Sequence, residues 1–169
     1  MMNSLLRLMR HRRYDAEDAR RLLGAGALER LRARVAASEV RHSGEIRLCI
    51  EGGLPWSYLK RDASARERAV AMFGKLRVWD TEHNNGVLIY LLLAEHAIEV
   101  VADRGVDRAV DDAHWKAIAA TMAAAFAQGR FEDGLNAAID AVDALLAAHF
   151  PIAAGARNAN ELPDEPDVR

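Results

Sequence analysis

The residues best suited to chemistry gather in two polar runs, each next to an apolar segment. Residues 79–86 carry acids, amides and a histidine and lead directly into the apolar run 87–93, and residues 102–107 follow the next apolar segment. Polar groups at the end of a rigid strand can be held accurately enough for binding or catalysis. The residues predicted as ligands of a divalent cation are Asp80, Glu82, Asn85, Asp103 and Asp107.

Carboxylate and amide oxygens together suit a hard divalent cation, either Ca²⁺ or Mg²⁺. Arg104 lies among them, where it would hold a phosphate oxygen or neutralise the carboxylates. His83 or Glu45 would move a proton as a general acid or base. His83, Arg104 and Glu45 are therefore the candidate catalytic residues.

The same residues also have a simpler interpretation. Acidic loops are commonly solvated turns, and Asn85-Gly86 is a frequent turn dipeptide. Asp103 and Arg104 would then form only a local ion pair at a strand end. Because no regular metal-ligand spacing is present, the predicted metal site depends on where the fold places these residues.

The predicted topology brings the polar segments together. Strand 45–51 alternates polar and apolar residues, which predicts a strand covered on one face and near a sheet edge. It connects through a helix to the buried strand 87–93, so the two strands are expected to be parallel. The short link before strand 97–102 predicts an antiparallel hairpin. The segments around Glu45, Asn85 and Asp103 should therefore converge at one end of the sheet.

Helical periodicity predicts helices over 26–41 and over 57–77. A further helix should begin after the N-cap pair Asp111-Asp112, and the last helix should end at Pro151. The fold class is α/β, a three-layer α/β/α sandwich around a small mixed sheet that contains a β-hairpin. The predicted division of the chain is a basic helical segment over 1–25, the α/β domain over 26–151, and a disordered polar tail over 152–169.

Composition narrows the function classes. The chain has 169 residues, 51% apolar, which is enough for one domain with its own core. A net charge of −2 gives no general attraction to nucleic acid. The single cysteine excludes a disulfide framework, and no dinucleotide, phosphate-loop or serine-hydrolase motif is present.

No apolar run is long enough to form a transmembrane segment. The first 13 residues are basic and leucine-rich but lack the features of a secretory signal. They predict a helix that is docked or frayed, or one that lies on a membrane surface or a partner. The expected location is cytoplasmic, with a peripheral position at a membrane as the alternative.

At these residues the chain resembles the TPM-domain family, over about residues 28–150. The resemblance rests on four motifs, which are His42-Ser43-Gly44-Glu45-Ile46, the run from Trp79 to Tyr90, Val101-Ala102-Asp103-Arg104-Gly105, and the run from Gln128 to Leu135. It implies a compact α/β/α sandwich around a small mixed sheet.

The resemblance also implies two kinds of activity. Members in plant thylakoids are regarded as acid phosphatases with a divalent-metal site, and others serve as assembly or accessory factors of membrane complexes. Glu45, Asn85 and Gly86 match the family motif, and Asp107 matches in type only. Secreted members tend to have Gly-x-Gly-Leu-Glu where this chain has residues 103–107, so the metal site could be altered or replaced.

Two functional hypotheses therefore stay open. The first is a non-catalytic accessory or interaction module with a divalent-metal rim, serving a membrane-associated protein partner. The alternative is a metal-dependent acid phosphatase that acts on phosphomonoesters. Whether the chain is an enzyme, and its oligomeric state, are not determined at this level.

Overall fold

The computed structural model describes residues 4–153, 156 and 158–169, and within them four strands form one mixed sheet in the order β3-β2-β1-β4. The strands are β1 (Glu45–Glu51), β2 (Gly86–Leu92), β3 (Ala97–Ala102) and β4 (Asp167–Val168). β1 and β2 are parallel, with Glu45 opposite Gly86, and β2 and β3 are antiparallel, with Val87 opposite Ala102. The predicted parallel pair and the predicted hairpin are both confirmed.

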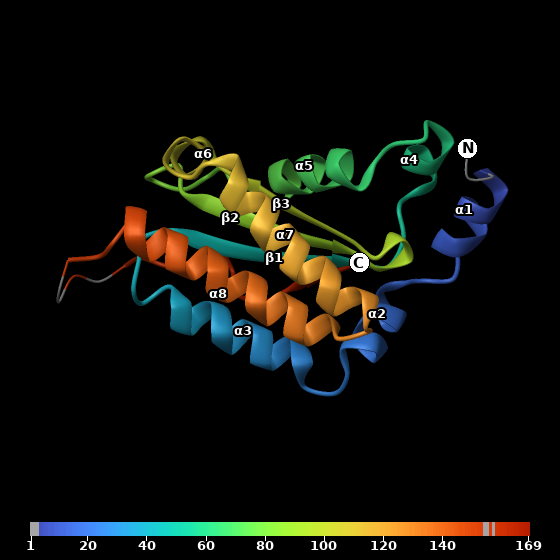
Figure 1. Ribbon diagram of the computed structural model, residues 1–169, viewed down its shortest axis with the longest axis horizontal. Helices are drawn as coiled ribbons and strands as arrows, with labels where there is room; N and C mark the ends of the chain where they lie inside the picture. The colour runs from blue at the N-terminus through green and yellow to red at the C-terminus, as the bar shows by residue number, and fades with distance from the viewer. Residues whose placement is uncertain (1–3, 154–155, 157) are drawn as a thin grey trace.

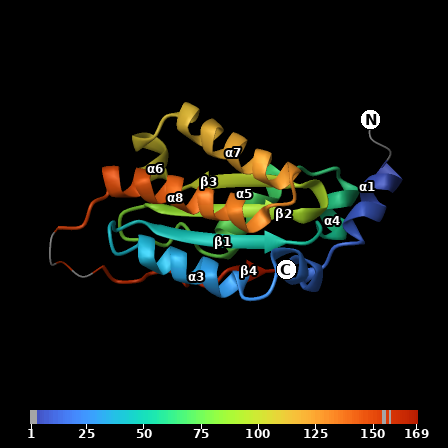
Figure 2. The same cartoon turned by 60° about the horizontal axis from the view of Figure 1, so that its bottom comes forward.

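Helices cover both faces of this sheet (Figures 1 and 2). Those that pack on one face, around a core that includes Leu31, Leu135 and Ile139, are α2 (Ala16–Leu23), α3 (Ala27–Ser38), α6 (Arg104–Ala109), α7 (Asp112–Ala127) and α8 (Phe131–His149). The opposite face is covered by α5 (Ala65–Lys75), whose Ala69 and Met72 are fully buried. The predicted three-layer α/β/α sandwich is confirmed.

The predicted single helix over 57–77 is wrong, because two helices occupy this segment. α4 (Trp56–Lys60) ends before Asp62, which has a left-handed φ of 54°, and α5 begins after Ser64. Ser64 and Glu67 form a reciprocal capping box, in which each side chain bonds the other's backbone N–H. This local start signal, together with the reversal at Asp62, outweighs the continuous apolar periodicity.

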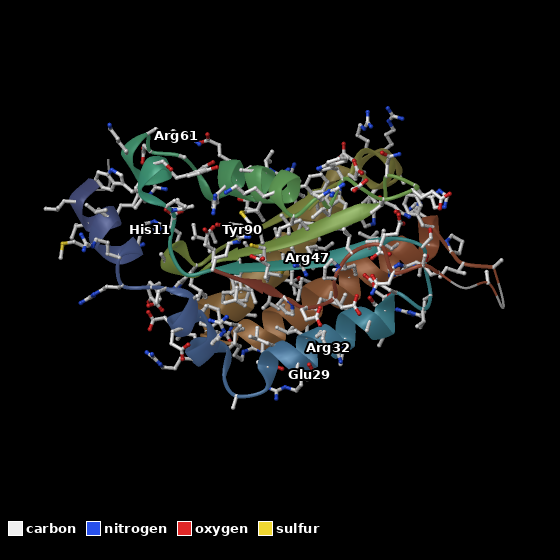
Figure 3. The ribbon with its side chains drawn as sticks, turned by 180° about the vertical axis from the view of Figure 1, so that it is seen from behind. His11, Glu29, Arg32, Arg47, Arg61 and Tyr90 are labelled. Carbon is white, nitrogen blue, oxygen red and sulfur yellow. The ribbon has the colours of Figure 1, made fainter. Side chains whose placement is uncertain are left out.

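The prediction that β1 is covered on one face only is also wrong. All seven of its residues are buried, including the polar ones. Arg47 donates to the carbonyl oxygen of Pro163 at 2.7 Å, and Glu51 pairs with Arg68 of α5. Figure 3 shows Arg47 and Tyr90 at the middle of the sheet. Polar side chains could therefore be buried here because each finds a specific partner.

A disordered tail is predicted over 152–169, of which residues 154, 155 and 157 lie outside the described residues, but the structure orders residues 158–169. Residues 167 and 168 form β4, which extends the sheet beside β1 with Asp167 opposite Cys49. Leu162 is buried in the core under α5. The segment therefore gains order from backbone pairing and one apolar anchor, although its composition resembles that of a disordered tail.

The predicted N-terminal segment over 1–25 contains two helices in its described part. α1 (Ser4–His11) lies at one end of the molecule (Figure 1), whereas α2 packs into the main core through Ala19 and Leu23. Residues 16–25 are thus continuous with the α/β domain. No helix among the described residues is long and apolar enough to cross a membrane.

Candidate functional site

The three polar segments meet at one end of the sheet, as the topology predicts. The backbone N–H of Glu45 donates to the carbonyl oxygen of Asn85 at 3.3 Å. The N–H of Asp103 donates to the carbonyl of Gly86 at 2.9 Å, and that of Gly105 donates to the carbonyl of Asn84 at 2.9 Å. Backbone hydrogen bonds therefore fix the relative positions of all three segments.

Glu45 is buried beneath the C-terminal segment and does not open onto solvent. Its two carboxylate oxygens accept the backbone N–H groups of Glu161 and Leu162, both at 3.2 Å. Burial raises the pKa of Glu45 to about 7, because a charge is disfavoured away from water. Glu45 is predicted to carry a proton, but its carboxylate already binds the backbone of the C-terminal segment.

Asn85 and Asp103 each keep one buried side-chain oxygen without a partner among the described residues. Asn85 donates through Nδ2 to Ser43 Oγ at 3.1 Å, and its Oδ1 is unpaired. Asp103 is the N-cap of α6 and accepts the N–H of Arg104 through Oδ1 at 2.7 Å, while its Oδ2 is unpaired. Buried polar atoms are normally satisfied, so these two oxygens are available to a water or a cation.

The other predicted metal ligands point to solvent. Asp80 is paired with Arg77 at 2.5 Å, and Asp107 is exposed in the first turn of α6. Glu82 is exposed as well, and its backbone N–H donates to Glu161 Oε2 at 2.9 Å. In the part of the chain that the structure describes, no three His, Cys, Asp or Glu residues lie together so that they could hold a metal ion. The predicted ligands thus share one end of the sheet without forming one carboxylate cluster.

A basic pocket of about 350 Å³ opens at the same end, and its lining residues are His83, Asn84, Arg104, Gly105 and Arg108. α6 begins at Arg104 and places Arg108 one turn later on the same side of the helix. Neither arginine forms an ion pair with any described residue, which is unusual beside so many acids. We refer to this site as the basic pocket.

Gly105 allows the close approach that shapes the basic pocket. A Cβ atom at this position would lie 2.5 Å from the carbonyl oxygen of Asn84 and 2.8 Å from that of His83. Any larger residue would push α6 away from the 79–86 segment. The predicted candidates His83 and Arg104 are therefore brought together, and Arg108 is the residue that sequence analysis missed. The Arg-x-x-x-Arg spacing was visible, but no helix was predicted there.

The pocket lining favours an anion over a cation. It holds two guanidinium groups, an imidazole and an amide, and it includes no carboxylate. Guanidinium groups bind carboxylates and phosphates through paired N–H donors. None of the lining residues is a serine, threonine or cysteine, so the pocket lining provides no hydroxyl or thiol nucleophile, and His83 is its one side chain with a nucleophilic atom.

Comparisons with known proteins agree with this architecture. A family model described as the TPM domain matches residues 16–145. The BA42 protein of the psychrophilic bacterium Bizionia argentinensis, known from an NMR structure, is 26% identical. Its TM-score is 0.73, with 85% of this chain and 92% of that chain covered.

The N-terminal domain of a P. gingivalis protein, known from a solution NMR structure, is 19% identical to this chain. Its TM-score is 0.61, and the match covers 83% of this chain and 98% of that chain. This second likeness concerns the fold alone. No curated protein matches the chain.

Proposed function

Because the chain belongs to the TPM-domain family, we propose that it acts as a non-catalytic accessory module whose basic pocket binds an anionic group of a membrane-associated protein partner. The observation that carries this proposal is the pair of arginines, Arg104 and Arg108, that line one pocket without an ion-pair partner among the described residues. The bound group would be a phosphate or a carboxylate, because both fit the planar donor geometry of arginine.

Binding is favoured over catalysis by what surrounds the pocket. His83 is exposed and can donate a hydrogen bond to the same anion, and Asn84 can add an amide. Glu45, the other predicted proton carrier, is hydrogen bonded to the tail backbone instead. A site that holds an anion by several donors, with no hydroxyl or thiol nucleophile in its lining, fits recognition of a partner.

Of the predicted metal ligands, this proposal keeps only Asn85 and Asp103. Asn85 Oδ1 and Asp103 Oδ2 are the protein oxygens that would hold a Ca²⁺ or Mg²⁺ ion, because both are buried and unpaired among the described residues. Ca²⁺ takes about six to eight oxygen ligands and Mg²⁺ about six. Water or the bound anion would have to supply most of them.

A second candidate function, a metal-dependent acid phosphatase acting on phosphomonoesters, is favoured by those same two oxygens. Asp103 directly precedes Arg104, so a cation held there would lie near the basic pocket. A divalent cation supplies Lewis-acid polarisation of a phosphoryl oxygen. In this chain Arg104 and Arg108 would orient the phosphate, and His83 would give a proton to the leaving oxygen.

Calorimetric titration with inorganic phosphate and with a phosphoserine peptide tests the accessory hypothesis. Replacing Arg104→Gln together with Arg108→Gln should weaken binding at least about tenfold, since each charged hydrogen bond contributes ~1.5–3 kcal/mol. The matched control, Arg10→Gln with Arg13→Gln, removes the same charge from α1 and its end and should bind as the parent does. Equal weakening in both variants would mean that only net charge matters, which would contradict a specific pocket.

Hydrolysis of p-nitrophenyl phosphate distinguishes the two candidates. Activity is measured with EDTA, Ca²⁺ or Mg²⁺ on the parent and on the variant Asn85→Ala with Asp103→Asn. The accessory hypothesis predicts no metal-dependent turnover above the variant. Turnover that requires a metal and disappears in the variant would establish the phosphatase instead.

A further inference from the structure

The helix α1 presents an apolar surface to solvent at the end of the molecule opposite the basic pocket (Figure 1). Leu5, Leu6 and Met9 are 60%, 59% and 55% exposed. Trp56 of α4 is 62% exposed and lies next to α1, where it lines a groove with Leu8 and Arg12. Large apolar side chains gathered on one surface, in contrast to isolated ones, mark an interaction site. We refer to these four residues as the α1 surface.

The opposite side of α1 is fixed to the protein by side-chain hydrogen bonds. Arg7 donates to Glu95 at 2.8 Å, to Asp62 at 2.7 Å and to the carbonyl oxygen of Ala63 at 2.6 Å. Three long-range contacts from one side chain hold the helix at a single orientation.

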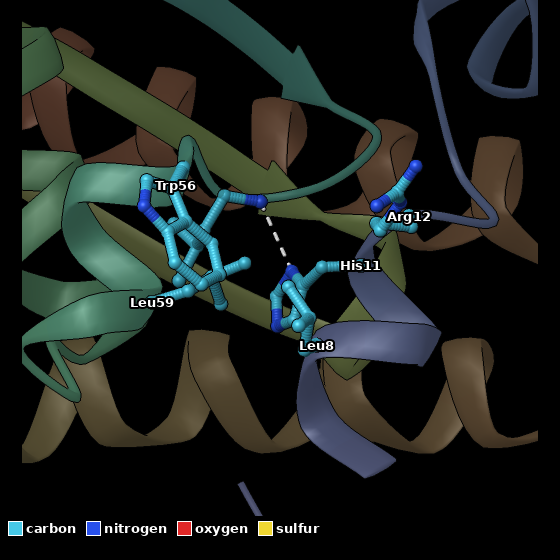
Figure 4. Close-up of a pocket in the computed structure, with 6 residues that line it drawn as sticks. Leu8, His11, Arg12, Trp56 and Leu59 are labelled. Carbon is cyan, nitrogen blue, oxygen red and sulfur yellow. Dashed lines mark hydrogen bonds between the residues drawn. The ribbon is translucent and has the colours of Figure 1, made fainter. Parts of the chain in front are cut away.

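His11 adds a second, fully buried attachment (Figure 4). The backbone N–H of Leu54 donates to its Nδ1 at 3.0 Å, which leaves Nε2 as the N–H that donates to Glu95 at 2.9 Å. Leu8 turns inward as well and lines a groove of about 450 Å³ together with Trp56 and Leu59. The inward positions are thus satisfied within the fold, and the outward apolar ones require a partner.

The acids next to α1, Asp62 and Glu95, are paired with Arg7, whereas three other arginines near the α1 surface are not paired with any described residue. Arg10, Arg12 and Arg13 are exposed, and none of them forms an ion pair with a described residue. The sequence of α1 contains no acidic residue. This local excess of positive charge contrasts with the net charge of −2 for the whole chain. A partner of this surface must therefore be negatively charged as well as apolar.

We infer that the α1 surface docks on an anionic lipid bilayer. Leucine, methionine and tryptophan side chains would enter the boundary between headgroups and acyl chains, while the adjacent arginines would bind lipid phosphates. The helix is too short to span a bilayer, so it would lie in the plane of the interface. Charge complementarity selects the bilayer, because an anionic leaflet is both apolar and negative over a wide area. The inference is independent of what the basic pocket binds.

Co-sedimentation with lipid vesicles tests this inference on the full chain. Binding is expected to phosphatidylcholine vesicles that contain phosphatidylserine, to be much weaker with phosphatidylcholine alone, and to decrease as salt is raised. Arg10→Gln with Arg13→Gln should lower the partition coefficient about 30-fold, since each basic residue near the surface contributes ~1 kcal/mol. The emission of Trp56 should shift to shorter wavelength on binding.

Leu6→Asp with Met9→Asp tests the apolar part of the surface and should abolish sedimentation. The matched control is Val40→Asp with Val70→Asp, which introduces the same charges at side chains that are 74% and 50% exposed and lie outside α1. All four positions are exposed, so melting temperatures should stay close to the parent value and exclude unfolding as the cause.

Two results would overturn the inference. One is a folded parent protein that does not sediment with anionic vesicles, or that sediments equally well after Leu6→Asp with Met9→Asp. The other is self-association that this variant abolishes, in the absence of vesicle binding, because the occupant would then be a second copy of the chain.

Discussion

At the residue scale, the most unusual groups are two buried carboxyls next to the C-terminal segment. Glu39 follows α3 and accepts the backbone N–H of Ile46 at 2.9 Å. Burial raises the pKa of Glu39 to about 9, and the charges of Glu45 and Asp164 add to this effect. Glu39 therefore carries a proton at neutral pH, and folding of the chain takes up that proton.

The proton on Glu39 makes stability depend on pH. A carboxyl whose pKa is raised in the folded state contributes most at low pH. Its contribution decreases as pH rises from about 4.5, where the unfolded chain ionises, to about 9. Glu39→Gln should leave stability near pH 5 almost unchanged and increase it near pH 8.5, because glutamine imitates the protonated acid.

Urea unfolding of Glu39→Gln and the parent at several pH values measures this effect. A shallower slope of unfolding free energy against pH is expected in the variant, with a remaining part from Glu45, whose pKa is about 7. Parallel slopes in the two proteins would show that Glu39 is already ionised in the folded state.

Substitution of two glycines provides a second prediction at this scale, because the expected changes in stability have opposite signs. A Cβ atom at Gly86 would lie 2.0 Å from the carbonyl oxygen of Val78, whereas one at Gly74 would have no atom within 4 Å. Gly86→Ala should destabilise the protein by about 1–3 kcal/mol or more, because backbone must move. Gly74→Ala should stabilise it by ~0.5–1 kcal/mol through helix propensity. Equal effects in chemical denaturation would contradict the close contact at Gly86.

At the scale of elements, a buried polar network attaches α5 to the sheet. Arg68 donates to both carboxylate oxygens of Glu51 on β1, at 2.9 and 2.7 Å, and the hydroxyl of Tyr90 on β2 donates to the same carboxylate at 2.6 Å. Hydrogen bonding to Glu51 raises the pKa of Arg68 further, so this arginine stays charged. One helix and two strands are thereby held in register.

Removal of Arg68 should be costly because it leaves a buried carboxylate without its counter-ion. Arg68→Met is expected to destabilise the chain by about 3–5 kcal/mol, and Arg68→Met with Glu51→Gln should recover part of that loss. The exposed pair Arg61 and Glu67, whose side chains are 53% and 50% exposed, provides the control. Loss of this pair through Arg61→Met, which keeps Glu67 in its capping box, should cost less than ~1 kcal/mol in the same denaturation experiment. A similar cost for both pairs would refute the importance of burial.

At the scale of the whole molecule, the C-terminal segment closes one edge of the sheet. It adds β4 beside β1, buries Leu162, and receives hydrogen bonds from Arg47 through two backbone carbonyls. Cys49 lies on β1 beneath this segment, fully buried, with Sγ 3.9 Å from Asp167 Oδ1. Burial raises the pKa of the Cys49 thiol, which makes it unreactive in the native state.

The reactivity of Cys49 therefore reports whether the C-terminal segment is docked. Deletion of residues 158–169 should accelerate labelling by a thiol reagent at least about tenfold, which corresponds to ~1.4 kcal/mol less free energy of local opening. The labelling rate is measured without denaturant, and circular dichroism confirms that the deleted protein stays folded. An unchanged rate in a folded deletion variant would show that α5 alone shields the thiol.

The molecule as a whole has two functional ends. The basic pocket lies where β1 and β2 begin, and the α1 surface lies beyond the end where these strands finish (Figure 1). Docking of the α1 surface on a bilayer would point the basic pocket away from the lipid, toward a partner. This arrangement connects the two proposals geometrically, although each has its own test.

The sequence by itself determined the elements whose signals are local and strong. The apolar run 87–93 could only be a buried strand. The helix that connects strand 45–51 to it requires the two strands to be parallel, as they are. Asp111 caps α7 through two backbone N–H groups, as predicted. Convergence of the segments around Asn85 and Asp103 followed from this topology. Periodicity and capping are properties of neighbouring residues, so they are readable without the fold.

Only the tertiary structure decided which side chains find partners. Glu45 and Asn85 belong to segments that meet. Glu45 is hydrogen bonded to the backbone of the C-terminal segment, whereas one side-chain oxygen of Asn85 has no partner among the described residues. The ordered tail itself depends on contacts with β1 that lie more than 100 positions earlier in the chain. Arg108 entered the basic pocket because α6 turns it toward His83. Such pairings balance burial against hydrogen bonding between distant residues, and no local pattern records that balance.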